Sequence, residues 1–307
     1  MVNELFEKRV VLVTGKGGVG RTTVTAALAL AAARAGKRVL VTEIREPTEQ
    51  GWSHLARYFG RETLPHTAEE LAPGVRGSLL VTEKGTELFL GSVLRVRAMA
   101  RLAMRVGPLV SFLHATPSFH ELGVFYHLLT YIQEKDRSGR PLNELILMDM
   151  PATGHTIALT GLPDILLRII PSGPIATALR DGQSVLNDPR TAAACVVTLP
   201  ELLPITEAIE LVEGLRETRV PVGGIIVNRV PRTEFSESEW DALRAMLDDG
   251  GIFGRTALDR VERAGEAIQR LKESTEVGIR EWDEILEGEG RAVVNALADR
   301  LSEGEAS

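Results

Sequence analysis

The chain has 307 residues, 44% of them hydrophobic and 25% charged, which is enough apolar sequence to build the core of a globular protein. Its net charge of −7 gives no overall electrostatic reason to bind nucleic acid or an anionic membrane. A single cysteine, Cys195, excludes an intrachain disulfide and any metal cluster made of cysteines from one chain.

The first eight residues contain Glu4 and Glu7 and do not form the basic segment plus apolar run of a secretory signal. The longest apolar runs along the chain fall well short of the ~20 residues that a membrane helix needs. We therefore expect a cytoplasmic protein with no stable membrane insertion.

The first forty-five residues predict one β-α-β unit. Arg9 to Thr14 is a continuous apolar run, typical of a strand buried on both faces of a parallel sheet. Thr22 to Ala35 is rich in alanine and leucine and predicts a helix, which Gly36 would end. Arg38 to Ile44 predicts the second strand.

The same alternation returns later and predicts a doubly wound, mostly parallel α/β sheet. No linker or repeat interrupts the pattern, so we expect a single domain over residues 1–302 and a flexible tail over 303–307. The later elements are a strand over Glu144–Met150, a turn over 151–155, a helix over Thr156–Ile170, a strand over Ala193–Leu199, a helix over Ile205–Thr218, a strand over Val222–Val227 and a last helix over Arg291–Leu301.

Residues 86–135 predict a helical insertion of different character. The segment is apolar and carries two methionines and three arginines at four-residue spacing, which form one stripe on a helix. An ordinary amphipathic helix with a solvated face is the simpler interpretation, and a surface that binds a protein client is the alternative. The residues concerned are Met99, Met104, Arg97, Arg101 and Arg105.

The glycine-rich run after the first strand satisfies two motifs. Gly15 to Gly20 matches G-x-G-x-x-G, and Glu43 ends the second strand, where a dinucleotide fold places an acid for the ribose. Extended to Thr22, the run matches the phosphate-loop pattern G-x-x-x-x-G-K-[ST] except at Arg21. Both motifs use backbone N–H groups at a helix start to bind phosphate.

Three features favour the phosphate loop. Lys16 lies inside the loop and has no role in the dinucleotide motif, and Thr22 provides a hydroxyl suited to Mg²⁺. Asp149 ends a buried strand, where it can serve the magnesium shell, although an aspartate there alone is often a turn residue. The sequence therefore predicts an ATP site with Mg²⁺.

Two segments carry a resemblance to one family. Lys16–Thr23 (KGGVGRTT) resembles the deviant Walker A loop, and Asp149–His155 (DMPATGH) resembles the switch of the ArsA family of arsenite-pump and guided-entry ATPases. The resemblance runs from the first strand to Arg229, about three-quarters of the chain. Glu43 is similar to the acid that ends the second strand in the bacterial, often paired, guided-entry-like branch.

The resemblance implies a deviant-Walker-A P-loop fold and a role for each matching residue. Lys16 would cross a dimer interface to the partner's phosphates, Thr22 and Asp149 would hold Mg²⁺, and Glu43 would activate the attacking water. Thr23 would bind the α-phosphate, and Asn228, beside Arg229, would read adenine. The binding set is Gly15, Lys16, Gly17, Gly18, Val19, Gly20, Arg21, Thr22, Thr23, Asn228 and Arg229, and the γ-phosphate switch is Thr153, Gly154 and His155.

Two residues depart from the family pattern at catalytic positions. Arg21 replaces the loop lysine with a bulkier guanidinium, and Glu43 is longer than the usual aspartate. We therefore expect a slow ATPase that works as a homodimer or as a heterodimer with a related ATPase and handles a protein client or partner. The alternative is a nucleotide-binding regulatory or scaffold subunit with little turnover.

Other functions are disfavoured. Arsenite capture and a zinc-bridged dimer both need more thiolates than one cysteine supplies. His114, His120 and His127 are spread along one segment and are interpreted as surface or core residues. A positioning ATPase of the MinD kind would end in a basic membrane helix, whereas this chain ends in an acidic tail.

Overall fold

The computed structural model describes residues 1–44, 52–85, 87–88, 119–151, 153–169, 171–232, 235–248, 255–286 and 288–303. Its centre is a sheet of eight strands in the order β3-β4-β2-β5-β1-β6-β7-β8, in which β3 alone is antiparallel to its neighbour. The strands are β1 Val10–Gly15, β2 Val39–Ile44, β3 Glu69–Ala72, β4 Val75–Leu80, β5 Leu145–Asp149, β6 Ala192–Thr198, β7 Val222–Val230 and β8 Ile279–Asp283.

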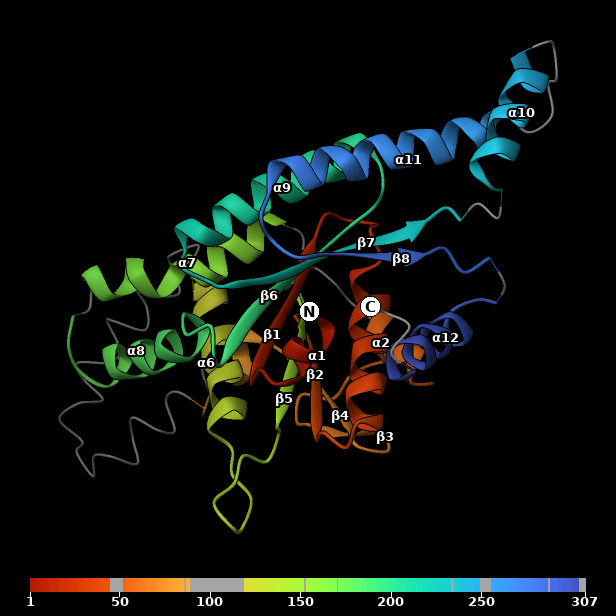
Figure 1. Ribbon diagram of the computed structural model, residues 1–307. Coiled ribbons are helices and arrows are strands. Elements are labelled where there is room, and N and C mark those ends of the chain that lie inside the picture. Colours follow the sequence, from red (N-terminus) through yellow and green to blue (C-terminus); the bar gives the residue numbers. More distant parts are fainter. Residues whose placement is uncertain are drawn as a thin grey trace.

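Helices cover both faces of the sheet (Figure 1). One face packs against α1 Val2–Phe6, α2 Arg21–Arg34, α3 His54–Tyr58 and α12 Arg291–Ser302. The other packs against α6 Phe119–Gln133, α7 Thr153–Ile169, α8 Pro174–Leu186, α9 Leu202–Glu217 and α11 Arg255–Ser274. The helix α10 Glu237–Asp248 extends beyond the sheet at the far end of α11 (Figure 1).

The central strand β1 shows why the sheet needs a helical layer on each side. Val11 and Val13 belong to the core on the α2 side, and Val10 and Leu12 belong to the core on the α9 side. Since side chains alternate along a strand, a continuous apolar run such as this one is stable only when both faces are covered. The predicted doubly wound, mostly parallel sheet is confirmed.

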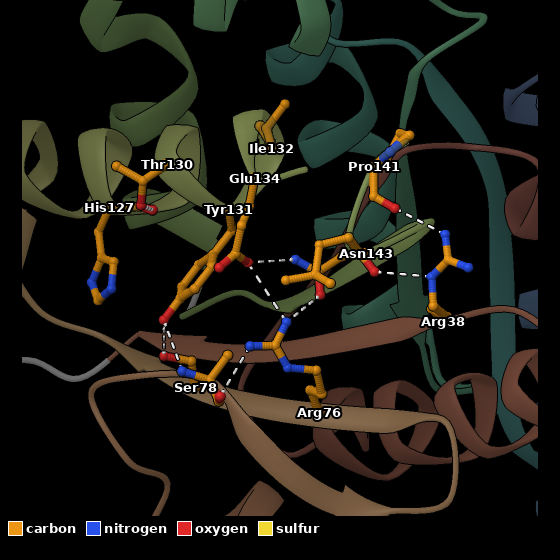
Figure 2. A network of polar contacts seen from close by, with 12 residues as sticks. Arg38, Arg76, Ser78, His127, Thr130, Tyr131, Ile132, Glu134, Pro141 and Asn143 are labelled. Atoms are coloured by element: carbon orange, nitrogen blue, oxygen red, sulfur yellow. Dashed lines mark hydrogen bonds and ion pairs between the residues drawn. The ribbon is translucent and has the colours of Figure 1, made fainter. Parts of the chain in front are cut away.

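A set of polar residues lies at the amino-terminal end of β4 and β5 (Figure 2). We call Arg76, Tyr131, Glu134 and Asn143 the amino-end cluster. Asn143 is 1% exposed; its Oδ1 accepts from Arg76 at 3.1 Å, and its Nδ2 donates to Glu134 at 3.3 Å. Tyr131 donates to or accepts from Ser78 at 2.8 Å. These bonds tie α6 to the sheet.

The strands and helices expected from the sequence are present with ends shifted by a few residues. The largest shifts are at α7 and α9, which begin three residues early, and at β7, which ends three residues late. For α7 the expectation of a turn through residue 155 is wrong, because the helix begins at Thr153 and Gly154 lies in its first turn, where helix ends vary. Several elements were not expected. The edge strands β3 and β8 contain charged residues and no apolar run, so their sequence resembles that of a loop.

Much of the predicted insertion over residues 86–135, including its arginine stripe, lies outside the described residues; within it, 119–133 form α6. Among the helices that are described, none has the length and apolar character needed to cross a membrane. The single domain over 1–302 stays a prediction, and residues 304–307 of the tail are outside the described part.

Candidate functional site

The glycine loop joins the end of β1 to the start of α2 in a conformation that requires glycine. A Cβ atom on Gly15 would clash with the carbonyl oxygen of Val197, and one on Gly20 would clash with the amide of Asn228. Gly20 is also the N-cap of α2 with a φ of 93°, and it offers no side-chain acceptor to the first turn. The N–H groups of that turn are therefore available to an anion, which the helix dipole also favours.

Glu43, Asp149 and Asn228 lie at or near the carboxyl-terminal ends of β2, β5 and β7, and Thr22 in the first turn of α2 contacts Asp149 there. We call these four residues the carboxyl-end site. The Thr22 hydroxyl donates to Oδ2 of Asp149 at 2.7 Å. Asp149 is 7% exposed, and its second oxygen, Oδ1, is buried without a hydrogen-bond partner. Burial raises the pKa of Asp149 to about 7, although the Thr22 hydrogen bond and the Arg21 charge oppose the rise.

Arg21 is directed toward the strand that carries Asp149. Its guanidinium donates to the carbonyl oxygen of Met150, directly after that strand. Burial lowers the pKa of Arg21, and the charge of Asp149 opposes this change. The residue that replaces the loop lysine is thus bonded to the segment leading into α7.

Glu43 neighbours Asp149 across the β2–β5 pair and holds the start of α3. Its Oε2 accepts from the Ser53 hydroxyl at 2.5 Å and from the backbone N–H of Leu55 at 3.3 Å. Ser53 in turn caps α3, because its Oγ accepts from the N–H of Ala56 at 2.9 Å. The acid predicted to activate water therefore also fixes a helix beside the loop.

Lys16 points out of the loop and forms an ion pair with Glu207 of α9. The lysine side chain is 50% exposed, whereas that of Glu207 is 20% exposed. Lys16, which is predicted to reach the phosphates of a partner subunit, is thus paired with Glu207 of its own chain.

A pocket of about 300 Å³ adjoins the start of α2. Thr23 and Tyr58 contribute to one side of it, and their hydroxyl oxygens are 2.8 Å apart. Asn228 also lines the pocket, and its Nδ2 donates to the loop carbonyl of Val19 at 2.9 Å. Arg229 follows with a φ of 57°, a conformation that is uncommon for residues other than glycine and often found at functional sites. The remaining wall comes from Asp283–Ile285, Gly288–Gly290 and α12.

The structure thus brings together the loop, Thr22, Thr23, Glu43, Asp149, Asn228 and Arg229 at one edge of the sheet. Comparison with known proteins finds similarity to ATPases of the family that the sequence motifs resemble. Residues 8–49 match the family described as anion-transporting ATPase. The ATPase BagA of Mycobacterium tuberculosis is 26% identical over 89% of this chain and 82% of its own length.

Two further relatives show the breadth of the match. An arsenical pump-driving ATPase of Escherichia coli is 28% identical over 72% of this chain, but the match covers 35% of that longer protein. An ATPase ASNA1 homolog of Entamoeba dispar is 22% identical over 72% of this chain and 76% of its own length.

This chain is a homologue of the ArsA-type ATPases.

The predicted switch, Thr153, Gly154 and His155, forms the first turn of α7. The side chains of these three residues lie outside the described part, so their role stays a prediction. The next residue, Thr156, is buried, and its hydroxyl lies 2.9 Å from that of Thr14 on β1. The start of α7 is therefore bonded to the strand that leads into the glycine loop.

Sequence reasoning missed three residues that contact the site: Ser53, Tyr58 and Glu207. Each touches a predicted residue from another element, at Glu43, Thr23 and Lys16 respectively. None lies in a motif, so nothing in its local sequence could have revealed it.

Proposed function

We propose that this chain is a Mg·ATP-binding ATPase that acts as a dimeric nucleotide-driven switch with slow hydrolysis. The observation that carries the proposal is the glycine loop at the start of α2, with Thr22 and Asp149 beside it and a base-sized pocket adjoining it. The homologues named as ATPases support nucleotide-binding ATPase activity. We expect the triphosphate along the loop and the base in the pocket with Asn228.

The residues present fit magnesium. A threonine hydroxyl and a carboxylate are the hard oxygen donors that Mg²⁺ prefers, and the unpaired Oδ1 of Asp149 is a buried acceptor in need of a partner. Thr22 and Asp149 would hold the ion, which would neutralise charge on the phosphates. Glu43 would orient the attacking water.

Slow turnover is proposed from Arg21. Its guanidinium is bonded to Met150 rather than extending along the loop as a compact ammonium would. Arg21 would therefore hold the segment before α7 and contribute little to neutralising the charge of the transferred phosphate.

Dimer formation is proposed from Lys16, whose side chain is half exposed and can leave Glu207 for the phosphates of a partner subunit. The partner would be a second copy or a related ATPase. The surface that would hold a protein client is assigned to residues 86–132 on their sequence alone. Arsenite is not proposed as a substrate, because Cys195 is buried and burial raises its pKa to about 12.

Phosphate release and sedimentation test the proposal together. We expect slow release that needs Mg²⁺, is abolished by Lys16→Ala and rises with Arg21→Lys, and a dimer that forms with Mg·ATP. Lys37→Ala is the matched control, because Lys37 pairs with Glu7 away from the loop. A protein that stays monomeric with Mg·ATP would remove the cross-subunit role of Lys16.

The second candidate is a regulatory or scaffold subunit that binds nucleotide without useful turnover, and the Arg21–Met150 bond is the observation that favours it. Wild-type protein that binds Mg·ATP but releases no phosphate, together with an active Arg21→Lys variant, would support this candidate. Robust wild-type turnover lost in Lys16→Ala would exclude it.

A further inference from the structure

The contact between Tyr58 and Thr23 has no role in the function proposed so far. Tyr58 is the last residue of α3, Thr23 lies in the first turn of α2, and their hydroxyl oxygens are 2.8 Å apart at the wall of the pocket. Either hydroxyl could donate in the chain as it stands. A bound nucleotide would remove that freedom.

Each hydroxyl has one hydrogen to donate, and a phosphate oxygen only accepts. If the Thr23 hydroxyl donates to the α-phosphate, it has no hydrogen left for Tyr58. The Thr23–Tyr58 bond then survives only with Tyr58 as donor. A donor in this position also polarises the threonine hydroxyl and strengthens the bond that it makes.

We propose that Tyr58 is a positioning residue of the nucleotide site, which donates to Thr23 and thereby directs the threonine hydrogen toward the α-phosphate. This inference rests on the proposed ATP-binding function and on the place given there to Thr23.

The position of Tyr58 is set from the other end of α3. Ser53 is fully buried, caps this short helix and donates to Glu43 at 2.5 Å, and Glu43 also accepts from Leu55. The helix then runs for five residues, and Tyr58 is the last of them. A continuous set of bonds therefore runs from Glu43, beside Asp149, to the hydroxyl pair at the pocket. Loosening the start of α3 should affect the nucleotide through Tyr58.

Calorimetric titration of ADP and adenosine into the full chain tests the proposal. Tyr58→Phe keeps the ring and removes the hydroxyl, so the affinity for ADP should fall about three- to tenfold. The affinity for adenosine, which has no phosphate, should not change. Thr23→Val should weaken ADP by a similar factor, and the double variant should be no weaker than Thr23→Val alone.

Ser53→Ala extends the test to α3. It should weaken ADP binding in the wild-type background and have no further effect when Tyr58 is already phenylalanine. Tyr131→Phe is the matched control, because it removes a buried hydroxyl from the amino-end cluster and should leave ADP affinity unchanged. Thermal unfolding of every variant establishes that it is folded.

The outcomes distinguish a failure of this inference from a failure of the proposed ATP-binding function. Wild-type protein that binds neither ADP nor ATP would overturn the proposed function and this inference with it. If the wild type binds ADP and Tyr58→Phe binds it equally well, the role of Tyr58 alone is wrong. Equal losses for ADP and adenosine would also overturn it, because Tyr58 would then be a wall for the nucleoside rather than an orienting donor.

Discussion

Polar residues gather at both ends of the central sheet, and the two groups differ in how completely they are bonded. In the amino-end cluster, Asn143 uses its amide oxygen and nitrogen within the protein, and Arg76 bonds Asn143, Glu134 and the carbonyl of Ala68 (Figure 2). In the carboxyl-end site, Asp149 is buried with Oδ1 unpaired.

The difference supports the proposal that the carboxyl-end site binds a ligand, whereas the amino-end cluster is structural. Within the described part of the chain, the buried side-chain atoms without a partner are Thr42 Oγ1, Asp149 Oδ1 and Trp282 Nε1, and no atom of the amino-end cluster is among them. A saturated network holds elements together, whereas an orphaned carboxylate beside open N–H groups suits a cation with its phosphates.

The largest expected effect tests whether the loop geometry serves binding. Gly20→Ala adds a Cβ that clashes with Asn228 at a left-handed φ, so we expect Mg·ATP affinity to fall on the order of a thousandfold, about 4 kcal/mol. Gly36→Ala is the matched control at the other end of α2, with a φ of 86° and no atom within 4 Å of the new Cβ. Calorimetry with both variants makes the comparison, and a loss below tenfold in Gly20→Ala would contradict the geometry.

The next effect is a pH dependence of stability that comes from His127 of α6, whose ring stacks on Tyr131 of the amino-end cluster. His127 is 1% exposed, and burial, with the nearby Lys84 charge, lowers its pKa to about 4. The unfolded chain takes up this proton near pH 6.5, so the folded state loses up to ~3 kcal/mol as the pH falls from 6.5 to 4.

His127→Gln should remove this part of the acid loss, and urea unfolding across that pH range measures the difference. If the free energy of unfolding changes with pH in the same way for the wild type and the variant, the fold does not keep His127 neutral.

A matched pair of asparagine variants compares the two ends directly. Asn143→Ala should lower the free energy of unfolding by about 2 kcal/mol, because it leaves Arg76 and Glu134 short of a partner, and should not change ADP affinity. Asn228→Ala should lower ADP affinity about tenfold, since Asn228 lines the pocket and bonds the loop. Loss of ADP affinity in folded Asn143→Ala would remove the distinction between the clusters.

The smallest effect concerns the Lys16–Glu207 ion pair, which is partly exposed and worth at most ~1 kcal/mol. Glu207→Gln releases Lys16, so the dimer with Mg·ATP should form two- to fivefold more tightly in sedimentation. Glu281→Gln, which breaks the Lys272 pair, is the control. Weaker dimerisation in Glu207→Gln would mean that Glu207 serves the interface rather than holding Lys16 back.

The sequence predicted the part of the fold that depends on local pattern. The β1–α2–β2 unit, β5, β6 and β7 are buried apolar runs between helices, and they are found where periodicity places them. The edge strands β3 and β8 have no such pattern, because each has a neighbour on one side only and a partly exposed surface.

The same distinction between local pattern and contacts across the fold applies to the residues of the candidate site. Motifs single out Gly20, Thr22 and Asp149 as candidates from the sequence, and the pairing of β1 with β5 places them at one edge of the sheet. Tyr58 and Glu207 reach the site from α3 and α9 through side-chain contacts across the fold, which no local pattern specifies.

Calorimetric titration of the wild-type chain with Mg·ATP and, separately, with NADH tests the central claim most directly. The carboxyl-end site predicts saturable binding of Mg·ATP, weakened when magnesium is removed, and no heat of binding with NADH. Binding of NADH without binding of Mg·ATP would contradict the account, because the same glycine loop would then hold a dinucleotide.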